Sequence, residues 1–572
     1  MTFEILEHVT AAEPVARAEQ SMVRMRDGVR LATDVYLPPV PGRHGVVLIR
    51  GPYDKNSRYQ GLADMAEVFN DRGLVLVAQD VRGKFRSEGV THPYVSDVAD
   101  AYDTLDWIIG QSWSNGSVGL VGVSYLGFTV WAGIASGHPA VKGAVPQGTG
   151  VNMARHHLGS PWRQDPAPLL GADDLLQIWA DNDIRYLSID YTRAPLIDTF
   201  EEAARSIGVR PPALDDYFRR VRTGDVFNPY GDRHPYWTTN VPVLHWSNWF
   251  DPGLGPEGLH DFRYFRGAGG RRGLHYLRAE SADHGGVRLE DIPYADQQHP
   301  WVNDAEHTQV QYRQAIDAAD FLLPLLTGRG SLPSPSQRVR WHTGHAGWRT
   351  AEDWPPAGVV HRNLFLSAAD SALDGSEGGA LSHHPDTERA TVSWEHDPAS
   401  PVPSSVTHDE WWTFLASYPD ERDFGSRSDV VTFTSEPTPT ALDIAGNAVL
   451  NVRAATSGPS MHLFAKLLDV APDGSARPVS HGRTLLERPD LEDLISFELD
   501  AVAYRVRPGH RLRLHLASSD YPLWVRHPGT DENPWHAELF EVNHQRLLLG
   551  GLDASHLRLP IYPDSGDEGL RL

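Results

Sequence analysis

The apolar and polar positions of this chain form two successive patterns, one that alternates strands with helices and one made of strands alone. Between residues 45 and 145, short continuous apolar runs are separated by segments in which apolar residues recur every three or four positions. Continuous runs are typical of strands buried on both faces, and the wider spacing is typical of amphipathic helices. The alternation predicts a mostly parallel sheet covered by helices.

The first pattern also predicts individual elements. A hairpin is expected over residues 23–31, with Asp27 and Gly28 in a type I′ turn. Ser96 is the expected N-cap of the second helix. Residues 149–239 carry no comparable strands and predict a helical insertion over the sheet. We expect strands at 45–49, 74–78, 118–121, 141–145, 241–246 and 274–277, and helices at 62–69, 98–109, 126–135 and 305–326.

The second pattern begins near residue 350. The stretch 328–360 before and around this point is rich in glycine, serine and proline, which is typical of a linker. Beyond it, apolar residues alternate at period two over 430–434, 448–454, 461–468 and 511–517. Many short alternating strands separated by turns predict an antiparallel sandwich or a jelly roll.

Ser124 occupies the corner between the predicted strand 118–121 and the helix 126–135. It stands two residues after Gly122 and three before Gly127, close to the Gly-x-Ser-x-Gly spacing of a nucleophile elbow. Such a turn strains the serine backbone and lifts its hydroxyl clear of the sheet. The backbone N–H of Tyr125 would then lie at a helix start, where it can stabilise an oxyanion. A chance glycine turn is the alternative, and the strand-to-helix context favours the elbow.

A serine nucleophile needs a base to remove its proton and an acid to orient that base. In α/β-hydrolases the acid follows the serine in the sequence and the histidine follows the acid, each on a loop after a strand. Asp251 follows the predicted strand 241–246, and His284 follows the next strand. Both would therefore stand at the carboxyl edge of the sheet. His275 and His260 are alternative bases.

Five stretches of the chain carry a more specific signal. They are Arg-Gly-Pro-Tyr-Asp-Lys at 50–55, Gln-Asp-Val-Arg-Gly at 79–83, Gly-Val-Ser-Tyr-Leu-Gly at 122–127, Trp-Phe-Asp at 249–251 and the run 509–521. Together they resemble the CocE/NonD hydrolases, which are relatives of X-Pro dipeptidyl-peptidases and α-amino-acid ester hydrolases. The resemblance implies an α/β-hydrolase core at 1–148 and 240–349, an inserted helical cap at 149–239 and a C-terminal β jelly roll at 350–572. It also implies that the Tyr53 hydroxyl and the Tyr125 N–H form the oxyanion hole.

Two stretches depart from the pattern of that family. The run Ser-Ala-Asp at 281–283 precedes His284, where the family usually has a Gly-Pro-Trp type of stretch. The run Asp-Pro-Gly at 251–253 lacks a bulky aromatic residue after the acid. We expect the catalytic residues to be kept and the substrate pocket to differ.

Composition and charge narrow the functional classes. The formal net charge is −24 and the sequence pI is about 5.5. The chain would therefore repel the phosphate backbone of nucleic acids and the surface of anionic membranes. The chain has no cysteine, which excludes thiolate chemistry and disulfides. No apolar run is long enough to span a membrane, and the first residues lack the features of a signal peptide. We therefore expect a cytoplasmic enzyme with no nucleic-acid or membrane partner.

Clustered histidines and aromatic residues are the remaining chemical candidates. Histidines at 156–157, 383–384 and 342/345 lack a third ligand at a suitable spacing, so we expect no metal and no cofactor. Asp173, Asp174 and the stretch from Asp181 to Asp183 could hold a substrate ammonium, although a solvated helix face is favoured. An apolar acyl pocket is expected where cap and jelly roll meet the core. Its candidates are Trp162, Trp179, Trp249, Phe250, Trp411 and Trp412.

These features predict a serine hydrolase that cleaves carboxylic esters through a covalent acyl-enzyme, with Ser124, His284 and Asp251 as its triad. Three alternatives stay open: amide cleavage of the X-Pro dipeptidyl-peptidase or β-lactam acylase type, acyl transfer to an alcohol or amine, and a binding protein with an inactive hydrolase core. The expected partner is a small-molecule ester, and the family resemblance suggests a homodimer.

Overall fold

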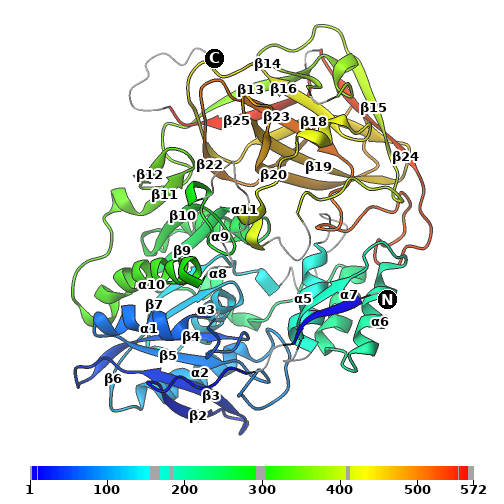
Figure 1. Cartoon of the computed structure of the whole chain (residues 1–572). Coiled ribbons are helices and arrows are strands. Elements are labelled where there is room, and N and C mark those ends of the chain that lie inside the picture. The colour runs from blue at the N-terminus through cyan, green and yellow to red at the C-terminus, as the bar shows by residue number, and fades with distance from the viewer. Residues whose placement is uncertain are drawn as a thin grey trace.

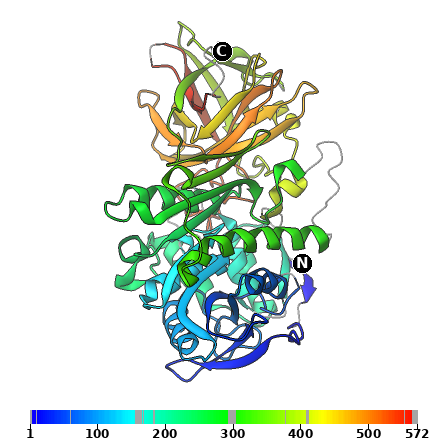
Figure 2. The ribbon, with the colours of Figure 1, turned by 90° about the vertical axis from the view of Figure 1, so that its left-hand side faces the viewer.

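The computed structural model of the 572-residue chain describes residues 3–8, 11–58, 60–154, 166, 168–180, 184–291, 304–375, 377–406, 412–551 and 553–563. Two large parts are stacked on one another, a sheet flanked by helices and an all-β C-terminal part (Figure 1). In the perpendicular view of Figure 2, the green strands that end the first sheet lie next to the C-terminal part. The arrangement confirms the predicted α/β-hydrolase core with a C-terminal β jelly roll.

The core sheet has ten strands in the order β12-β11-β10-β9-β7-β6-β4-β5-β3-β2. Neighbours from β11 to β5 run parallel, and β12, β3 and β2 join antiparallel at the two ends. The carboxyl ends of the parallel strands therefore meet at one edge. The strands are β2 (Glu19–Arg24), β3 (Arg30–Tyr36), β4 (His44–Gly51), β5 (Val75–Asp80), β6 (Ser114–Val123), β7 (Val141–Gln147), β9 (Val243–Phe250), β10 (His275–Asp283), β11 (Val339–Thr343) and β12 (Gly347–Ala351).

Helices cover both faces of this sheet because its central strands are apolar on both sides. Val46 and Leu48 of β4 belong to one apolar core, and Val47 and Ile49 belong to the other. The continuous apolar runs of the sequence follow from this two-sided burial. The first core is covered by α2 (Asp97–Ile109), α3 (Tyr125–Ser136) and α9 (Gly255–Gly267), the second by α1 (Leu62–Asp71) and α10 (Asp304–Thr327).

One local prediction in this part is wrong, and another is confirmed in position alone. The hairpin between β2 and β3 is present, but only Gly28 of its turn has a positive φ, 93°, and Asp27 does not. A type I′ turn needs positive φ at both central residues, so the predicted turn type is wrong. Ser96 does precede α2 as its N-cap, but its side chain makes no capping hydrogen bond.

In the described part of the segment between β7 and β9, one strand accompanies the helices. Strand β8 (Ile184–Ile189) pairs antiparallel with β1 (Phe3–His8) at the start of the chain. The expectation of helices alone was therefore wrong, because this pairing joins segments that are far apart in the sequence. The helices are α5 (Leu169–Ala180), α6 (Leu196–Ser206), α7 (Pro212–Thr223) and α8 (Pro235–Thr238).

The expected linker is shorter than its composition indicated. Strands β11 and β12 occupy residues 339–351 and extend the core sheet beyond β10. Val339 and Trp341 of β11 are buried. The glycine, serine and proline residues are most concentrated in residues 328–336, which lead from α10 to β11 as a loop that includes the start of a short 3-10 turn.

The C-terminal part consists mainly of antiparallel strands, with β14 and β16 as a parallel pair. The four strands predicted from period-two alternation are present as β16, β18, β19 and β23. One short helix, α11 (Phe414–Ser417), contacts β10 of the core. The strands are β13 (Val360–Ser367), β14 (Gly379–Ser382), β15 (Ala390–His396), β16 (Val431–Ser435), β17 (Leu442–Gly446), β18 (Val449–Thr456), β19 (Ser460–Val470), β20 (Ala476–Glu487), β21 (Ile495–Glu498), β22 (Val502–Val506), β23 (Arg511–Ala517), β24 (Asn543–Leu549) and β25 (His556–Ile561).

Candidate active site

Ser124 forms the sharp turn between β6 and α3, and its backbone is left-handed, with φ 58° and ψ −125°. For a residue other than glycine such a conformation is strained by about 1–3 kcal/mol. The turn is held by two hydrogen bonds. The Ser124 N–H donates to the carbonyl of Gln147 at the end of β7 (2.9 Å), and the Ser124 carbonyl accepts from Phe128 (3.0 Å). This is the backbone geometry expected of a nucleophile elbow.

Close steric contacts explain why two positions of the elbow are glycine. A Cβ atom on Gly122 would lie 2.2 Å from the carbonyl oxygen of Leu126, and one on Gly127 would lie 2.4 Å from Cγ2 of Thr149. Both distances are far shorter than van der Waals contact, so a side chain at either position would force its neighbours apart. Gly127 is therefore required even though it stands one residue later than in the Gly-x-Ser-x-Gly pattern.

The side chain of Tyr125 anchors the elbow from inside the core. Its hydroxyl donates to Oδ2 of Asp97 (2.8 Å) and accepts from the N–H of Tyr94 (2.9 Å). Arg50 lies 3.7 Å from the other carboxylate oxygen of Asp97. Burial raises the pKa of Asp97, and the charge of Arg50 opposes that rise. Any contribution of Tyr125 to chemistry thus comes from its backbone N–H, at a helix start where amides lack intrahelical acceptors.

His284 and Asp251 form a buried hydrogen-bonded pair at the carboxyl edge of the sheet. Asp251 directly follows β9, and His284 directly follows β10. Nδ1 of His284 lies 2.7 Å from Oδ2 of Asp251, and the two side chains are 9% and 0% exposed. The other oxygen of Asp251 accepts from the N–H of Leu254 at 3.4 Å. The structure thus brings together the acid and the base that the sequence predicted.

The turn after β7 connects this pair to Ser124. The carbonyl of Gln147 holds the Ser124 N–H, and the next residue, Gly148, has a φ of 49°. A Cβ atom on Gly148 would lie 3.5 Å from Cε1 of His284 and 3.6 Å from Oδ2 of Asp251. The imidazole therefore packs against the same strand end that holds the serine backbone.

The charges around His284 favour its protonated form. Burial alone would lower the pKa of the imidazole, but the charge and hydrogen bond of Asp251 outweigh it, and the pKa is raised above its ordinary value. Asp283 and Asp174 act in the same direction. Since Nδ1 is engaged with Asp251, Nε2 is the ring nitrogen suited to take a proton from a hydroxyl.

The two alternative histidines serve other parts of the fold. His275 is the first residue of β10, at the opposite end of the strand from His284. Its Nδ1 lies 2.9 Å from Nε2 of His245, its ring stacks on Phe265, and burial lowers its pKa to about 3. His260 is exposed on α9. Neither residue stands at the carboxyl edge.

Tyr53 lies two residues beyond β4, the neighbour of β6 in the sheet. A Cβ atom on Gly51 would lie 2.5 Å from Cδ1 of Leu126, so this strand end is packed directly on the first turn of α3. Tyr53 is half-buried against both apolar cores. The loop is held by Lys55, whose N–H donates to Oδ1 of Asp80 at 2.8 Å. Tyr53 is therefore fixed at the edge of the sheet where the elbow also stands.

Three of the aromatic pocket candidates pack close to the catalytic loops. The buried ring of Trp179 in α5 lies 4.7 Å from the ring of Tyr125. Phe250, which precedes Asp251, stacks on Phe414 of α11 with a centroid distance of 6.4 Å. The carbonyl of Trp412 accepts a hydrogen bond from the N–H of Gly285 at 2.7 Å. These contacts bring the cap and the C-terminal part against the core.

The other candidates are placed differently or lie outside the described residues. Trp249 donates from Nε1 to the carbonyl of His342 (2.8 Å) and stacks on Trp354, so its ring packs where the core sheet meets the C-terminal part. Trp162 and Trp411 lie outside the described residues.

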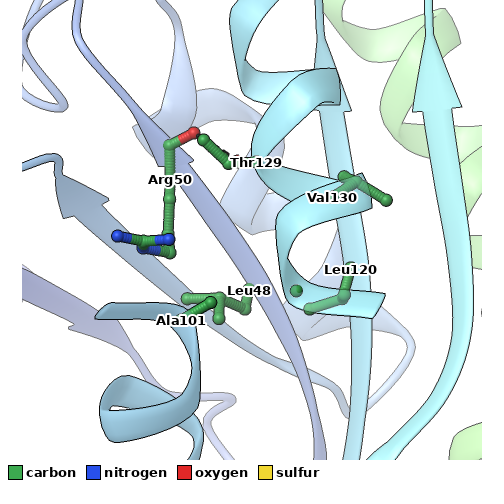
Figure 3. Close-up of a pocket in the computed structure, with 7 residues that line it drawn as sticks. Leu48, Arg50, Ala101, Leu120, Thr129 and Val130 are labelled. Atoms are coloured by element: carbon green, nitrogen blue, oxygen red, sulfur yellow. Dashed lines mark hydrogen bonds between the residues drawn. The ribbon is translucent and has the colours of Figure 1, made fainter. Parts of the chain in front are cut away.

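A small pocket lies inside the core between β4, β6, α2 and α3 (Figure 3). None of Ser124, Asp251 and His284 lines it, so it belongs to core packing rather than to the site. Its lining residues are Leu48, Arg50, Ala101, Leu120, Thr129, Val130 and Gly133.

The described residues offer neither a cluster of metal ligands nor a helix suited to a membrane. Among the described residues, no group of three or more histidine, aspartate or glutamate side chains could hold a metal ion. His342 instead lies 3.2 Å from the hydroxyl of Ser281. No helix in the described part of the chain has the length and apolar character needed to cross a membrane.

Comparison with known proteins places the chain in a family. Residues 27–284 match the family model of X-Pro dipeptidyl-peptidase (S15 family), and residues 332–558 match that of the X-Pro dipeptidyl-peptidase C-terminal non-catalytic domain. Cocaine esterase of Rhodococcus sp. (strain MB1 Bresler) is 27% identical over 588 residues, which cover 95% of this chain and 98% of the esterase. The chain belongs to the CocE/NonD family of hydrolases.

Solved structures share this CocE/NonD fold over nearly the whole chain. An α-amino acid ester hydrolase matches with a TM-score of 0.76 at 24% identity, covering 96% of this chain and 98% of that one. A CocE/NonD family hydrolase from Staphylococcus aureus matches with a TM-score of 0.63 at 16% identity, covering 95% and 93%. Within this chain, Tyr53, Ser124, Asp251 and His284 all fall inside the S15 match.

One residue of this edge was not predicted from the sequence. Asp283 is completely buried beside His284, and its carboxylate accepts two backbone hydrogen bonds. The sequence feature that could have identified it is an aspartate directly before the candidate base.

Proposed function

We propose that this chain is a serine hydrolase that cleaves carboxylic esters of small molecules through a covalent acyl-enzyme. The observation that carries the proposal is the buried hydrogen bond between His284 and Asp251, beside the strand end that holds the strained backbone of Ser124. A hydroxyl is a weak nucleophile until an oriented base removes its proton. Membership of the CocE/NonD family, with a cocaine esterase as a relative, supports ester substrates.

In the proposed reaction, Oγ of Ser124 attacks the acyl carbon while Nε2 of His284 takes the hydroxyl proton. Asp251 stabilises the imidazolium, and the Tyr53 hydroxyl and the Tyr125 N–H donate to the oxyanion. His284 then gives the proton to the leaving oxygen, which departs as an alcohol and leaves the acyl group on the serine. Water enters, and the same imidazole takes one of its protons as the oxygen attacks the acyl carbon. The bond between Oγ of Ser124 and the acyl carbon then breaks, His284 returns the proton to Oγ, and a carboxylic acid and the free serine are released.

The acyl group of the substrate would lie against aromatic side chains near this edge. Trp179 comes from the cap, Phe250 from the core, and Trp412 from the C-terminal part. Trp249, one residue before Phe250 on β9, would support the pocket from behind, because successive side chains of a strand point to opposite faces. This pocket would take an apolar acyl group.

Cleavage of amides with a free amino group is the second candidate. The matched family model carries the name of X-Pro dipeptidyl-peptidases. Asp174 of α5 is among the charges that act on His284, so a cap carboxylate lies within electrostatic range of the site. A carboxylate there would attract a substrate ammonium.

The test is hydrolysis of a panel of short-chain aryl esters, phenylglycine esters and X-Pro amides by the wild type and by Ser124→Ala. We expect ester turnover that falls by about 10⁴-fold or more in the variant, because removal of the nucleophile leaves only binding and oxyanion effects. A fluorophosphonate should label the wild type and not the variant. Unlabelled wild type without turnover would establish the binding-protein alternative, and preferred X-Pro turnover would establish the peptidase.

A further inference from the structure

The loop that carries His284 is tied on both sides to the C-terminal part of the chain. We propose that Asp283 is a positioning residue through which α11 holds the general base in place. The inference rests on the proposed function, since it assigns a role relative to the base named there. It explains why a carboxylate that no catalytic step uses stays buried one residue before His284.

Asp283 uses both of its carboxylate oxygens. Oδ1 accepts from the N–H of Val287 at 2.9 Å, which closes the His284 loop on itself. Oδ2 accepts from the N–H of Leu415 in α11 at 3.0 Å, which joins the loop to the C-terminal part. The side chain is 0% exposed. One carboxylate therefore fixes the shape of the loop and its position at the same time.

A second hydrogen bond to the C-terminal part is made by the residue just after the histidine. The N–H of Gly285 donates to the carbonyl of Trp412 at 2.7 Å. The residues on either side of His284 are thus both bonded to the segment 412–415. The same segment also reaches the residue before the acid, because Phe414 stacks on Phe250, which precedes Asp251. Segment 412–415 consequently contacts the loops of both the base and the acid.

The burial of Asp283 is unfavourable in itself. It raises the pKa of this carboxyl to about 8, against the hydrogen bonds from Val287 and Leu415 that favour the anion. Loss of either bond would let the loop shift relative to Ser124, and a displacement of about 1 Å at a reacting group can lower a rate by as much as about 10²-fold. The expected penalty is therefore on the rate of chemistry rather than on substrate binding.

Asp283→Asn is the sharpest test, because the amide keeps the size of the carboxylate but replaces one acceptor by a donor that faces a backbone N–H. The control is Asp469→Asn in β19, an aspartate 3% exposed that also accepts two hydrogen bonds, from Tyr504 (2.7 Å) and His510 (2.8 Å). Active enzyme is counted by fluorophosphonate titration, so that loss of folded protein does not enter kcat.

We expect Asp283→Asn to lower kcat by about 10- to 100-fold with KM within about twofold, as misplacement of a base requires. The downfield NMR signal of the proton between His284 and Asp251 should shift or broaden. Asp469→Asn should keep the wild-type kcat and signal. If Asp283→Asn does not fold, Asp283→Ser replaces it, since a hydroxyl is small and can accept one of the two bonds.

Wild-type kcat and an unchanged proton signal in the folded Asp283 variant would overturn the proposal. An equal loss of kcat in the Asp469 variant would also overturn it, since the effect would then be general destabilisation. Failure of the proposed function is distinguishable, because Ser124→Ala would then match the wild type on every ester.

Discussion

The core and the C-terminal part each contain a buried histidine bonded to an aspartate, and only one of these pairs stands beside a candidate nucleophile. Nδ1 lies 2.7 Å from the carboxylate in the pair of His284 and Asp251, and 2.8 Å in the pair of His510 and Asp469. The first pair follows the ends of two parallel strands. In the second pair, Asp469 lies within β19 and its other oxygen accepts from the hydroxyl of Tyr504.

The difference shows that a hydrogen bond to a carboxylate orients an imidazole but does not by itself make a catalytic base. In the core, the strained turn of Ser124 is bonded to the strand end against which His284 packs. In the C-terminal part, the carbonyl of His510 accepts from the N–H and the hydroxyl of Thr438, so that pair ties two loops together. Placement at the carboxyl edge of the parallel sheet separates the two roles.

The largest effect is expected when each of the two histidines is replaced in turn. His284→Ala should lower kcat by about 10⁴- to 10⁶-fold, because the nucleophile loses its base. His510→Ala should leave kcat within about twofold and lower the midpoint of thermal unfolding, since it leaves a buried carboxylate with one donor fewer. Steady-state kinetics on an aryl ester and calorimetry measure both. Equal losses of kcat in the two variants would remove the distinction.

A smaller effect is expected from two tyrosines, Tyr53 at the edge of the core sheet and Tyr504 beside Asp469. Tyr53→Phe should lower kcat/KM by about 10²- to 10³-fold, the usual effect of losing one oxyanion donor. Tyr504→Phe should keep kcat/KM and reduce the free energy of unfolding by about 1–3 kcal/mol, because Asp469 loses a buried donor. Denaturant titration of both variants is the matched measurement. Full activity in Tyr53→Phe would reassign that tyrosine to packing.

The smallest effect concerns pH. Protonated His284 cannot accept the serine proton, so activity falls as pH drops through its pKa. Asp251 holds that pKa above the ordinary value, against the effect of burial. The acid limb of kcat/KM should therefore have its midpoint above about 6.5, the unperturbed value of histidine. His510→Ala should leave this midpoint where it is. A midpoint below the ordinary value would contradict the assigned electrostatics.

Local sequence was sufficient for most of the fold and for the candidate residues. The elbow could be predicted because a strand, a serine between glycines and a helix follow one another within a few residues. Asp251 and His284 could be predicted because each follows a strand that begins with a short apolar run, and parallel strands bring their carboxyl ends to one edge. The four jelly-roll strands could be predicted because one-sided burial leaves a period of two in the chain.

The remaining features depend on contacts between distant segments, which leave no local pattern. The pairing of β1 with β8 and the addition of β11 and β12 to the core sheet required partners that periodicity does not reveal. Trp249 stands beside Phe250 in the sequence, and only its stacking on Trp354 places it at a junction. Asp283 is one of 75 acidic residues, and its contact with Leu415, 132 positions away, is what sets it apart. Chain neighbours determine backbone geometry, whereas burial and partners follow only from packing the whole chain.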